Sequence, residues 1–450
     1  MGMAPSTVNL HAKQPMTQPN PTLTAALCAL FLSVLPACAG ADARQEGTMD
    51  RPATFVPAAA APAPRGTPHP DSARFAVAAE AAWAYLAAHA SERTGLANAT
   101  SSYENITTWD VGGVLGAYFS AYRLGLIDRA EYERRMGSAL ATLEKVPLFD
   151  DGALNKVYSA SGARPIGRNG AASSGGFGWS ALDIGRVLIW LRIVAENDPR
   201  FAEQAGRVAE RMDYDRIVRG GYIWGEDRGS DGQARRYQEG KIGYEQYAEK
   251  GFRLWGHPAD FAADYTTNAG AGQVFGISLP VDQRGNHCLT SEPYYLMGIE
   301  TGWDDASAEL ARRILDVQRQ RWQREEIVTM ASEDAMTEAP HYFYYYCVLG
   351  QHGPFTVDAQ GTDAALDGPR WVSAKAAFAW HALLPDDYTA LAVERVQPAR
   401  TDRGWHSGVY EGSERPTGSI NLNTAAVILE AALYARLGRP LMEAGPGPGS

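Results

Sequence analysis

Apolar positions recur at helical spacing over most of the chain beyond residue 71, whereas strand-like alternation is scarce. Ser72 is a suitable cap for a first helix that runs through Phe75 to Leu86. The pattern then predicts helices at 109–125, 128–145, 179–197, 199–212, 243–256, 292–302, 304–322, 371–384, 386–395 and 421–437. Short strands are expected at Ile327–Met330 and Phe343–Val348. The chain is therefore predicted to be all-α, with long loops and a few short strands.

The predicted helices alternate between two kinds. One kind starts at a polar, acidic or aromatic turn and then becomes apolar and small; these starts are 108–112, 179–185, 244–251, 290–294, 371–375 and 421–425. The other kind is more charged, as at 128–145, 200–212 and 305–323. Six apolar helices with charged partners predict an (α/α)6 toroid or barrel, in which the inner helices begin around one mouth. An irregular helical domain is the alternative.

The first 38 residues predict an export signal. Residues 23–37 form an apolar run that is too short to span a membrane comfortably, and small residues follow it. Leu35–Cys38 resembles a bacterial lipobox, with Cys38 as the lipidated residue, while cleavage after Ala39 is the competing interpretation. We therefore expect a periplasmic or membrane-anchored protein that meets the membrane only through its lipid.

Composition limits the remaining domain plan. Residues 39–70 are rich in Ala and Pro and predict a disordered tether, 71–440 the folded domain, and 441–450 a disordered tail. Only Cys288 and Cys347 remain for the domain, either as a disulfide or as two buried thiols. A monomer is expected.

Charge and motifs exclude several functions. The net charge of -11 disfavours nucleic acid as a partner. The run Gly175–Gly178 lacks the strand that precedes a dinucleotide-binding loop, and the nine His residues show no paired metal-ligand spacing. We expect neither cofactor nor metal. By contrast, 11 Trp and 21 Tyr against 13 Phe favour rings with a polar atom, as carbohydrate clefts use.

The stretch Gly243–Trp255 places carboxylates beside aromatic rings. On a helix, Tyr244 and Tyr247 share a face next to Glu245, an arrangement that suits protonation of a glycosidic oxygen. Acidic residues at four apolar helix starts are the catalytic candidates: Asp110, Asp183, Glu245 and Glu292. Each alone could be a cap or a response to the helix dipole.

Substrate contacts are predicted from the residues around these acids. The candidates are Trp109, Trp179, Tyr244, Tyr247, Tyr294, Tyr342, Trp371, Lys375 and Trp405. Further acidic candidates lie at Glu333, Asp334, Glu338 and Glu411, and the loops 173–179 and 220–226 are expected to form rims of a cleft.

Six stretches in one order resemble the bacterial domain-of-unknown-function 3131 family: 107–112, 154–158, 179–186, 244–248, 289–295 and 421–430. The resemblance covers about residues 75–438. The family is similar in architecture to the glucoamylase-like and endo-β-1,2-glucanase families, which have (α/α)6 barrels and carboxylate catalysis. The resemblance thus implies a fold more directly than an activity.

These observations predict an exported glycoside hydrolase that acts on a bacterial glucan or exopolysaccharide, with inversion at the anomeric carbon. Glu245 is expected to be the general acid and Asp110 or Glu292 the base. One rival is a non-catalytic glycan-binding lipoprotein in polysaccharide export. The other is a toroidal polysaccharide lyase that uses a Tyr with a His or an Asn; the candidates are Tyr342, His341 and Asn268.

Overall fold

A computed structural model of the chain describes residues 66–284, 288–336, 343–359, 368–445 and 447. The predicted signal segment, Cys38 and most of the tether lie outside these residues, as do His341 and Tyr342. In the part of the chain that is described, no helix combines the length and the apolar character needed to cross a membrane.

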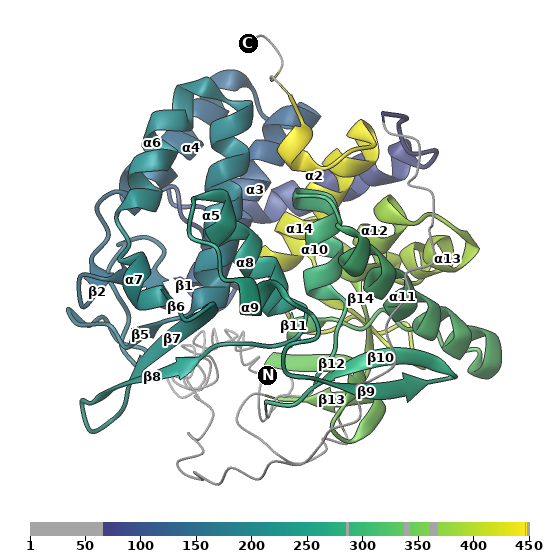
Figure 1. Cartoon of the computed structure of the whole chain (residues 1–450). Helices are drawn as coiled ribbons and strands as arrows, with labels where there is room; N and C mark the ends of the chain where they lie inside the picture. Colours follow the sequence, from purple (N-terminus) through teal and green to yellow (C-terminus); the bar gives the residue numbers. More distant parts are fainter. Residues whose placement is uncertain (1–65, 285–287, 337–342, 360–367, 446, 448–450) are drawn as a thin grey trace, which may run out of the picture.

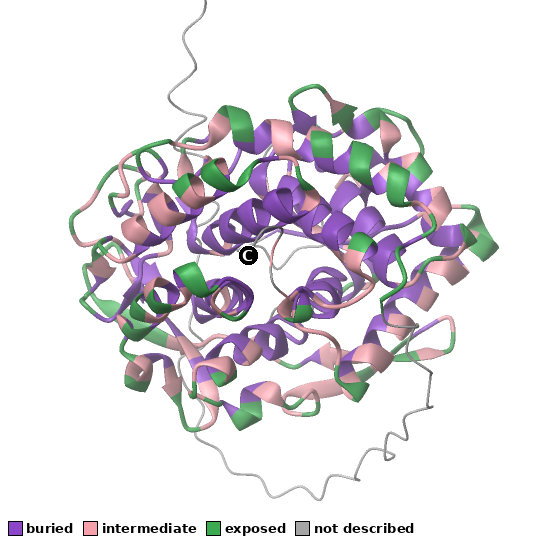
Figure 2. Ribbon diagram, turned by 90° about the horizontal axis from the view of Figure 1, so that it is seen from above, coloured by how far each residue is buried: buried purple, intermediate pink, exposed green. Residues whose placement is uncertain are grey.

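Six buried helices pack side by side in chain order: α3 (Thr108–Leu124), α5 (Ala181–Asn197), α8 (Tyr244–Leu254), α10 (Glu292–Glu300), α12 (Ala374–Leu383) and α14 (Leu422–Leu437). Each contacts the next, and α14 returns to α3. Viewed from above, they surround the centre of the molecule, and nearly all of their residues are buried (Figure 2). Most of these helices carry apolar residues on every face, because they touch neighbours on every side. The predicted helical architecture with a few short strands is confirmed in this coarser sense: helices form the core, and short strands connect them.

A second set of helices covers the first. It comprises α2 (Ser72–His89), α4 (Arg129–Leu143), α6 (Pro199–Glu210), α11 (Asp305–Glu325) and α13 (Asp387–Arg395), with the short α7 (Tyr214–Ile217) and α9 (Asp260–Ala263). α2 packs on α14, α4 on α3, α6 on α5, α9 on α8, α11 on α10, and α13 on α12. Their outward faces are exposed (Figure 2), which explains the charged sequences of these partner helices.

Strands connect the helices at one end of the molecule (Figure 1). Three antiparallel units are the longest: β7 (Tyr222–Arg228) with β8 (Ala234–Gln238), β9 (Ala269–Val274) with β10 (Ile277–Asp282), and β12 (Phe343–Gly350) between β11 (Glu333–Ala335) and β13 (Gly353–Asp358). Short pairs are β1 (Asn105–Thr107) with β4 (Val157–Ser159), β2 (Leu148–Phe149) with β3 (Ala153–Leu154), β14 (Trp371–Ser373) with β17 (Gly408–Tyr410), and β15 (Arg400–Thr401) with β16 (Gly404–Trp405). β5 (Gly178–Trp179) and β6 (Val218–Arg219) flank β7.

Two local predictions are wrong. The strand expected at 327–330 is reduced to one isolated bridge, between Met330 and Val372. The helix expected from 371 begins at Ala374, because Trp371–Ser373 pair with Gly408–Tyr410 as a strand. The strand expected at 343–348 is present and extends to Gly350.

The described structure reaches beyond the predicted domain limits of 71 and 440. His69 is buried, and its backbone N–H donates to Ala435 O. Asp71, not Ser72, occupies the N-cap position of α2. At the other end, Leu441–Glu443 form the 3-10 helix η2 with Leu441 buried, so the first residues of the predicted tail are ordered parts of the domain.

A disulfide joins Cys288 to Cys347. It connects the segment just before α10 to the middle of β12, and both residues are buried. Of the two states that the sequence left open for these cysteines, the structure contains the disulfide.

A Gly185→Ala substitution should lower the free energy of unfolding by about 1–3 kcal/mol, because it overpacks the contact between α5 and α8. A Cβ at Gly185 lies 2.5 Å from Ala248 Cα, which is main chain and cannot rotate away. Gly206→Ala on α6 is the matched control, since nothing lies within 4 Å of its Cβ position. Urea unfolding of both variants measures the difference. Equal stability of the two variants would contradict the predicted tight contact.

Candidate active site

A cavity of about 270 Å³ opens where the buried helices begin. This volume is just below the range of small-molecule pockets, about 300–1,000 Å³. The starts of α3, α5, α8, α12 and α14 contribute to its wall, together with the segment 237–241, Arg284, and residues of β11 and β12. Its carboxylates are Asp110, Asp183, Glu239, Glu333 and Asp334, its cations are Lys156, Lys241, Arg284 and Lys375, and its aromatic residues are Trp109, Tyr237, Tyr244, Phe343 and Tyr345.

Capping interactions at two helix starts hold Asp110 and Asp183. Thr107 caps α3, accepting from Asp110 N at 3.0 Å and donating to Asp110 Oδ2 at 2.8 Å. Ser180 repeats the arrangement on α5, with 3.2 Å to Asp183 N and 3.0 Å between its Oγ and Asp183 Oδ1. Each hydroxyl engages one carboxylate oxygen and fixes the side chain at the cavity wall.

The two carboxyl groups differ in proton affinity. Burial raises the pKa of Asp110 to about 6, against the effects of the Thr107 hydrogen bond and the Arg186 charge. Burial, followed by the negative charge of Glu239, raises the pKa of Asp183 to about 7. Near pH 6.5 Asp183 therefore holds a proton more often than Asp110 does.

Glu239 is a site residue that the sequence interpretation missed. Its carboxylate accepts from Ala181 N at the start of α5, and burial raises its pKa. Lys241, also missed, is 7% exposed, and its Nζ lies 3.6 Å from the centre of the Tyr345 ring. Both lie within the five residues before α8, so the polar segment ahead of this helix was the available signal.

Glu333 and Asp334 line the cavity from β11. Burial and the nearby Glu292 charge raise the pKa of Glu333 to about 7. Asp334 Oδ2 accepts from Trp371 Nε1 at 2.8 Å, and burial raises the pKa of Asp334 to about 6. The sequence placed these two residues among its further candidates, and the structure brings them to the same cavity as Asp110 and Asp183.

Glu245 does not line this cavity. It is 1% exposed, its Oε2 accepts from Arg284 Nη1 at 2.6 Å, and its Oε1 accepts from Gln238 Nε2 at 2.7 Å. Burial raises its pKa to about 7, although the Arg284 charge opposes this. Both oxygens of Glu245 hold residues of the cavity wall, so this geometry does not favour its role as general acid, which stays a prediction.

Both carboxylate oxygens of Glu292 are also hydrogen-bonded to neighbouring side chains. It is fully buried; its Oε2 accepts from Lys375 Nζ at 2.5 Å and its Oε1 accepts from Asn423 Nδ2 at 2.8 Å. Lys375 and Asn423 both face the cavity, whereas Glu292 does not line it. Glu292 therefore holds two residues of the wall, and its role as base stays a prediction that these contacts do not favour.

Among the predicted substrate contacts, Trp109, Tyr244 and Lys375 line the cavity. Five others lie in the core, at most 1% exposed: Trp179, Tyr247, Tyr294, Trp371 and Trp405. Four of those five donate to main-chain or buried groups: Trp179 to Trp224 O, Trp405 to Ala78 O, Tyr247 to Glu300 and Trp371 to Asp334. We do not retain the five as sugar platforms. Asn268, suggested for a lyase, precedes β9 and does not line the cavity.

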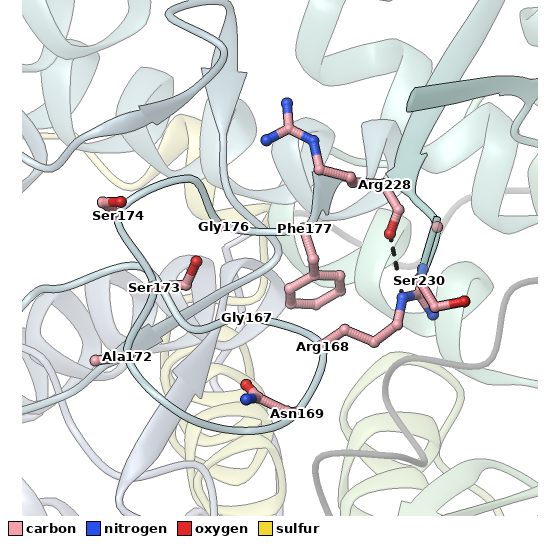
Figure 3. Close-up of a pocket in the computed structure, with 11 residues that line it drawn as sticks. Gly167, Arg168, Asn169, Ala172, Ser173, Ser174, Gly176, Phe177, Arg228 and Ser230 are labelled. Atoms are coloured by element: carbon pink, nitrogen blue, oxygen red, sulfur yellow. Dashed lines mark hydrogen bonds between the residues drawn. The ribbon is translucent and has the colours of Figure 1, made fainter. Parts of the chain in front are cut away.

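A second, wider hollow of about 680 Å³ lies between the loops 167–177 and 228–230. The side chain of Arg168 crosses it and donates to the main-chain oxygen of Arg228 at 3.2 Å (Figure 3). Its described lining includes the Phe177 ring but no carboxylate, so it offers no proton donor. The predicted rim loop 173–179 borders this hollow and not the acidic cavity.

Two clusters in the described part of the chain bring potential metal ligands close together. One contains Cys288 and Cys347, which form the disulfide. The other contains His69, Asp71 and His381, at the junction with the N-terminal segment. Asp71 N donates to His69 Nδ1 at 3.0 Å, and the proton of a neutral His69 then lies on its Nε2. Neither cluster lines the acidic cavity.

Solved structures of two kinds, a glucoamylase-like protein and β-1,2-glucanases, share the fold. The chain superposes on a glucoamylase-like protein of Bacteroides fragilis with a TM-score of 0.58 at 14% identity, covering 84% of this chain and 96% of that one. For an endo-β-1,2-glucanase of Chitinophaga pinensis in complex with sophorotriose and glucose, the TM-score is 0.56 at 12% identity. The superposition covers 83% of this chain and 96% of that one. A β-1,2-glucanase of Parabacteroides distasonis superposes with a TM-score of 0.57 at 15% identity. Here 83% of this chain and 58% of that one are covered. Identities this low establish the common fold alone.

Sequence comparison establishes the family. No curated protein shows a significant match to the chain. A family model described as "Protein of unknown function (DUF3131)" matches residues 77–438, which are most of the chain and nearly the span expected from the six motifs. The chain therefore belongs to the DUF3131 family, as its sequence motifs predicted.

Proposed function

We propose that this protein is a glycoside hydrolase that cleaves a glucan in the acidic cavity. The observation that carries the proposal is the meeting of Asp110 and Asp183 at one wall, with their pKa values raised to different extents, beside the ring of Trp109. A glycosidase needs one carboxyl group that holds a proton and one that is ionised. Aromatic faces beside them suit the apolar face of a sugar.

In this mechanism, protonated Asp183 donates its proton to the glycosidic oxygen as the bond from that oxygen to the anomeric carbon breaks. Ionised Asp110 accepts a proton from a water molecule, whose oxygen bonds to the same carbon. The products are two sugar chains, and the two carboxyl groups have exchanged protonation states. A water-activating base gives inversion, for which the two carboxyl groups are typically about 6.5–9.5 Å apart.

Glu239 assists the acid. Its carboxylate lies close enough to raise the proton affinity of Asp183, and the backbone N–H at the start of α5 keeps it in place. Lys156 opposes this effect but is itself held by Asp227 at 2.7 Å and Tyr237 at 2.9 Å. Glu333 is the competing proton donor, because its pKa is also raised to about 7.

The finer architecture belongs to the same proposal. We take the six buried helices and their outer partners as an (α/α)6 barrel, supported by the closed order of contacts from α3 to α14 and back. In such a barrel the inner helix starts share one mouth, and the cavity lies at that end. Helix dipoles pointing at the cavity favour negative charge there.

A β-1,2-linked glucan is the first substrate to test. The similar structures include endo-β-1,2-glucanases, one of them in complex with sophorotriose and glucose and another with sophorose. Export remains a proposal on the signal-like first 38 residues, with lipidation at Cys38. The Cys288–Cys347 disulfide supports it, because disulfides persist in oxidising compartments.

Incubation of the protein with glucans of different linkage, read out by product mass, tests the function. We expect shorter oligosaccharides whose mass includes one added water per bond cleaved. Unsaturated products absorbing in the ultraviolet would favour the lyase alternative. Binding without any product from any glycan of the panel would favour the non-catalytic alternative, and either result would overturn the hydrolase.

A further inference from the structure

Three ionisable side chains meet in the centre of the helix ring, below the cavity. Arg186 on α5, Glu300 on α10 and Glu430 on α14 are all 0% exposed. Arg186 Nη2 lies 3.5 Å from Glu430 Oε1, and Arg186 Nε lies 3.9 Å from Glu300 Oε1. Taking such charges out of water is costly, and well-packed apolar residues often replace buried ion pairs without loss of stability. The cluster therefore calls for a role besides stability.

Two carboxyl groups face this one guanidinium, and burial raises the pKa of both, that of Glu300 to about 7. Glu300 accepts from Tyr247 at 2.6 Å and from Trp190 Nε1 at 3.0 Å, contacts that favour its ionised form. Burial raises the pKa of Glu430 strongly, and the Glu300 charge adds to this. Glu430 therefore holds a proton more readily than Glu300 does.

The α3 helix makes room for this cluster with glycines. A Cβ at Gly112 would lie 2.8 Å from Arg186 Cγ, and one at Gly116 would lie 2.6 Å from Trp190 Cζ2. Larger residues at these positions would displace the Arg186 and Trp190 side chains. The position of the guanidinium is therefore fixed by shape as well as by charge.

Arg186 reaches from this cluster to the residues of the cavity wall. Its guanidinium carbon lies 4.8 Å from the centre of the Trp109 ring, within the range of a cation–π contact. Its Nη1 donates to Asn423 Oδ1 at 2.8 Å. Asn423 in turn donates to Glu292, which accepts from Lys375. Trp109, Asn423 and Lys375 all line the cavity.

We propose that Arg186 is a positioning residue: its planar guanidinium fixes the Trp109 ring and the Asn423 amide together, so that a sugar ring meets both in the geometry that cleavage needs. The inference rests on the proposed hydrolase function. Because Asn423 is bonded on both sides, its carbonyl to Arg186 and its amide to Glu292, it has a single orientation. A small displacement at such a wall reduces turnover strongly.

The test is an Arg186→Lys substitution, which keeps the buried charge but loses the planar fork and its stacking. We expect kcat/KM on the cleaved glucan, per folded molecule, to fall about 10- to 100-fold. This is the usual loss when a residue that holds the contacting groups in place is changed. Arg192→Lys is the matched control, since Arg192 lies on the same helix, 5.6 Å from the Trp255 ring, and pairs with Glu196 away from the cavity. Its kcat/KM should stay within about twofold of wild type.

Circular dichroism first establishes a temperature at which both variants are folded. Equal kcat/KM for the Arg186→Lys variant and wild type at that temperature would overturn the inference, whatever the loss of thermal stability. If wild type cleaves no glycan, the hydrolase proposal fails separately. A crystal structure of the Arg186→Lys variant then tests the positioning role of Arg186. Displaced Trp109 and Asn423 side chains would then support positioning, while unmoved ones would exclude it.

Discussion

Asp183→Asn should reduce kcat for glucan hydrolysis about 10²- to 10⁴-fold, because an amide cannot donate the proton that the leaving oxygen needs. The fold should be retained, since asparagine keeps the oxygen that meets Ser180 and removes only a carboxyl group that is protonated below about pH 7. Steady-state kinetics on the glucan measure the loss.

An activated substrate separates the roles of the two acids. A glucoside with a strongly acidic phenol as leaving group needs no protonation, so Asp183→Asn should affect its cleavage far less than it affects the glucan. Asp110→Asn should impair both substrates, because water must be activated in each case. Glu333→Gln is the control for the competing donor. A large loss in that variant, with Asp183→Asn near wild type, would transfer the acid role to Glu333.

The same two groups set the pH dependence. Asp110 must be ionised, so kcat/KM should fall as the pH drops below about 6. Asp183 must hold its proton, so kcat/KM should also fall as the pH rises above about 7. The pH profile of kcat/KM should therefore be bell-shaped, with its maximum between these values. The profile of the Asp183→Asn variant should lack the alkaline limb.

Lys375→Met should lower the free energy of unfolding by about 3–5 kcal/mol, because it leaves the carboxylate of Glu292 buried without its cation. The Lys375 and Glu292 side chains are 1% and 0% exposed, and their contact is 2.5 Å long. Urea unfolding, monitored by circular dichroism, measures the change.

Lys250→Met provides the matched control. Lys250 pairs with Asp304 at 2.8 Å, but the two side chains are 23% and 51% exposed. Solvent screens this pair, so the loss should be at most about 1 kcal/mol. Adding Glu292→Gln to Lys375→Met should restore part of the stability, because the unpaired charge is then gone. If the double variant is less stable than Lys375→Met alone, the buried charge is not the cause.

The sequence could predict the helices and part of the site because both follow from local rules. Asp110 and Asp183 were found through helix starts whose capping residues, Thr107 and Ser180, are three positions away. Glu245 and Glu292 satisfied the same pattern, but their partners lie far along the chain. Arg284 is 39 residues from Glu245, and Lys375 is 83 residues from Glu292. Nothing local indicates that such a carboxylate is already paired.

The predictions for the aromatic residues and for the strands were incomplete for related reasons. A Trp beside a helix start can face either the cavity, as Trp109 does, or the core, as Trp179 does, and tertiary packing alone decides. The β9–β10 hairpin was missed because Ala269–Gly272 consists of Ala and Gly, without the β-branched or aromatic residues that indicate a strand. It forms through pairing with Leu279–Asp282.

A crystal structure of the Asp183→Asn variant with a β-1,2-linked gluco-oligosaccharide tests the central claim most directly. The account predicts a sugar ring against Trp109 in the acidic cavity, with a glycosidic oxygen within hydrogen-bond distance of residue 183 and a water molecule beside Asp110. An oligosaccharide bound only elsewhere, for instance in the hollow beside Arg168 and Phe177, would contradict it.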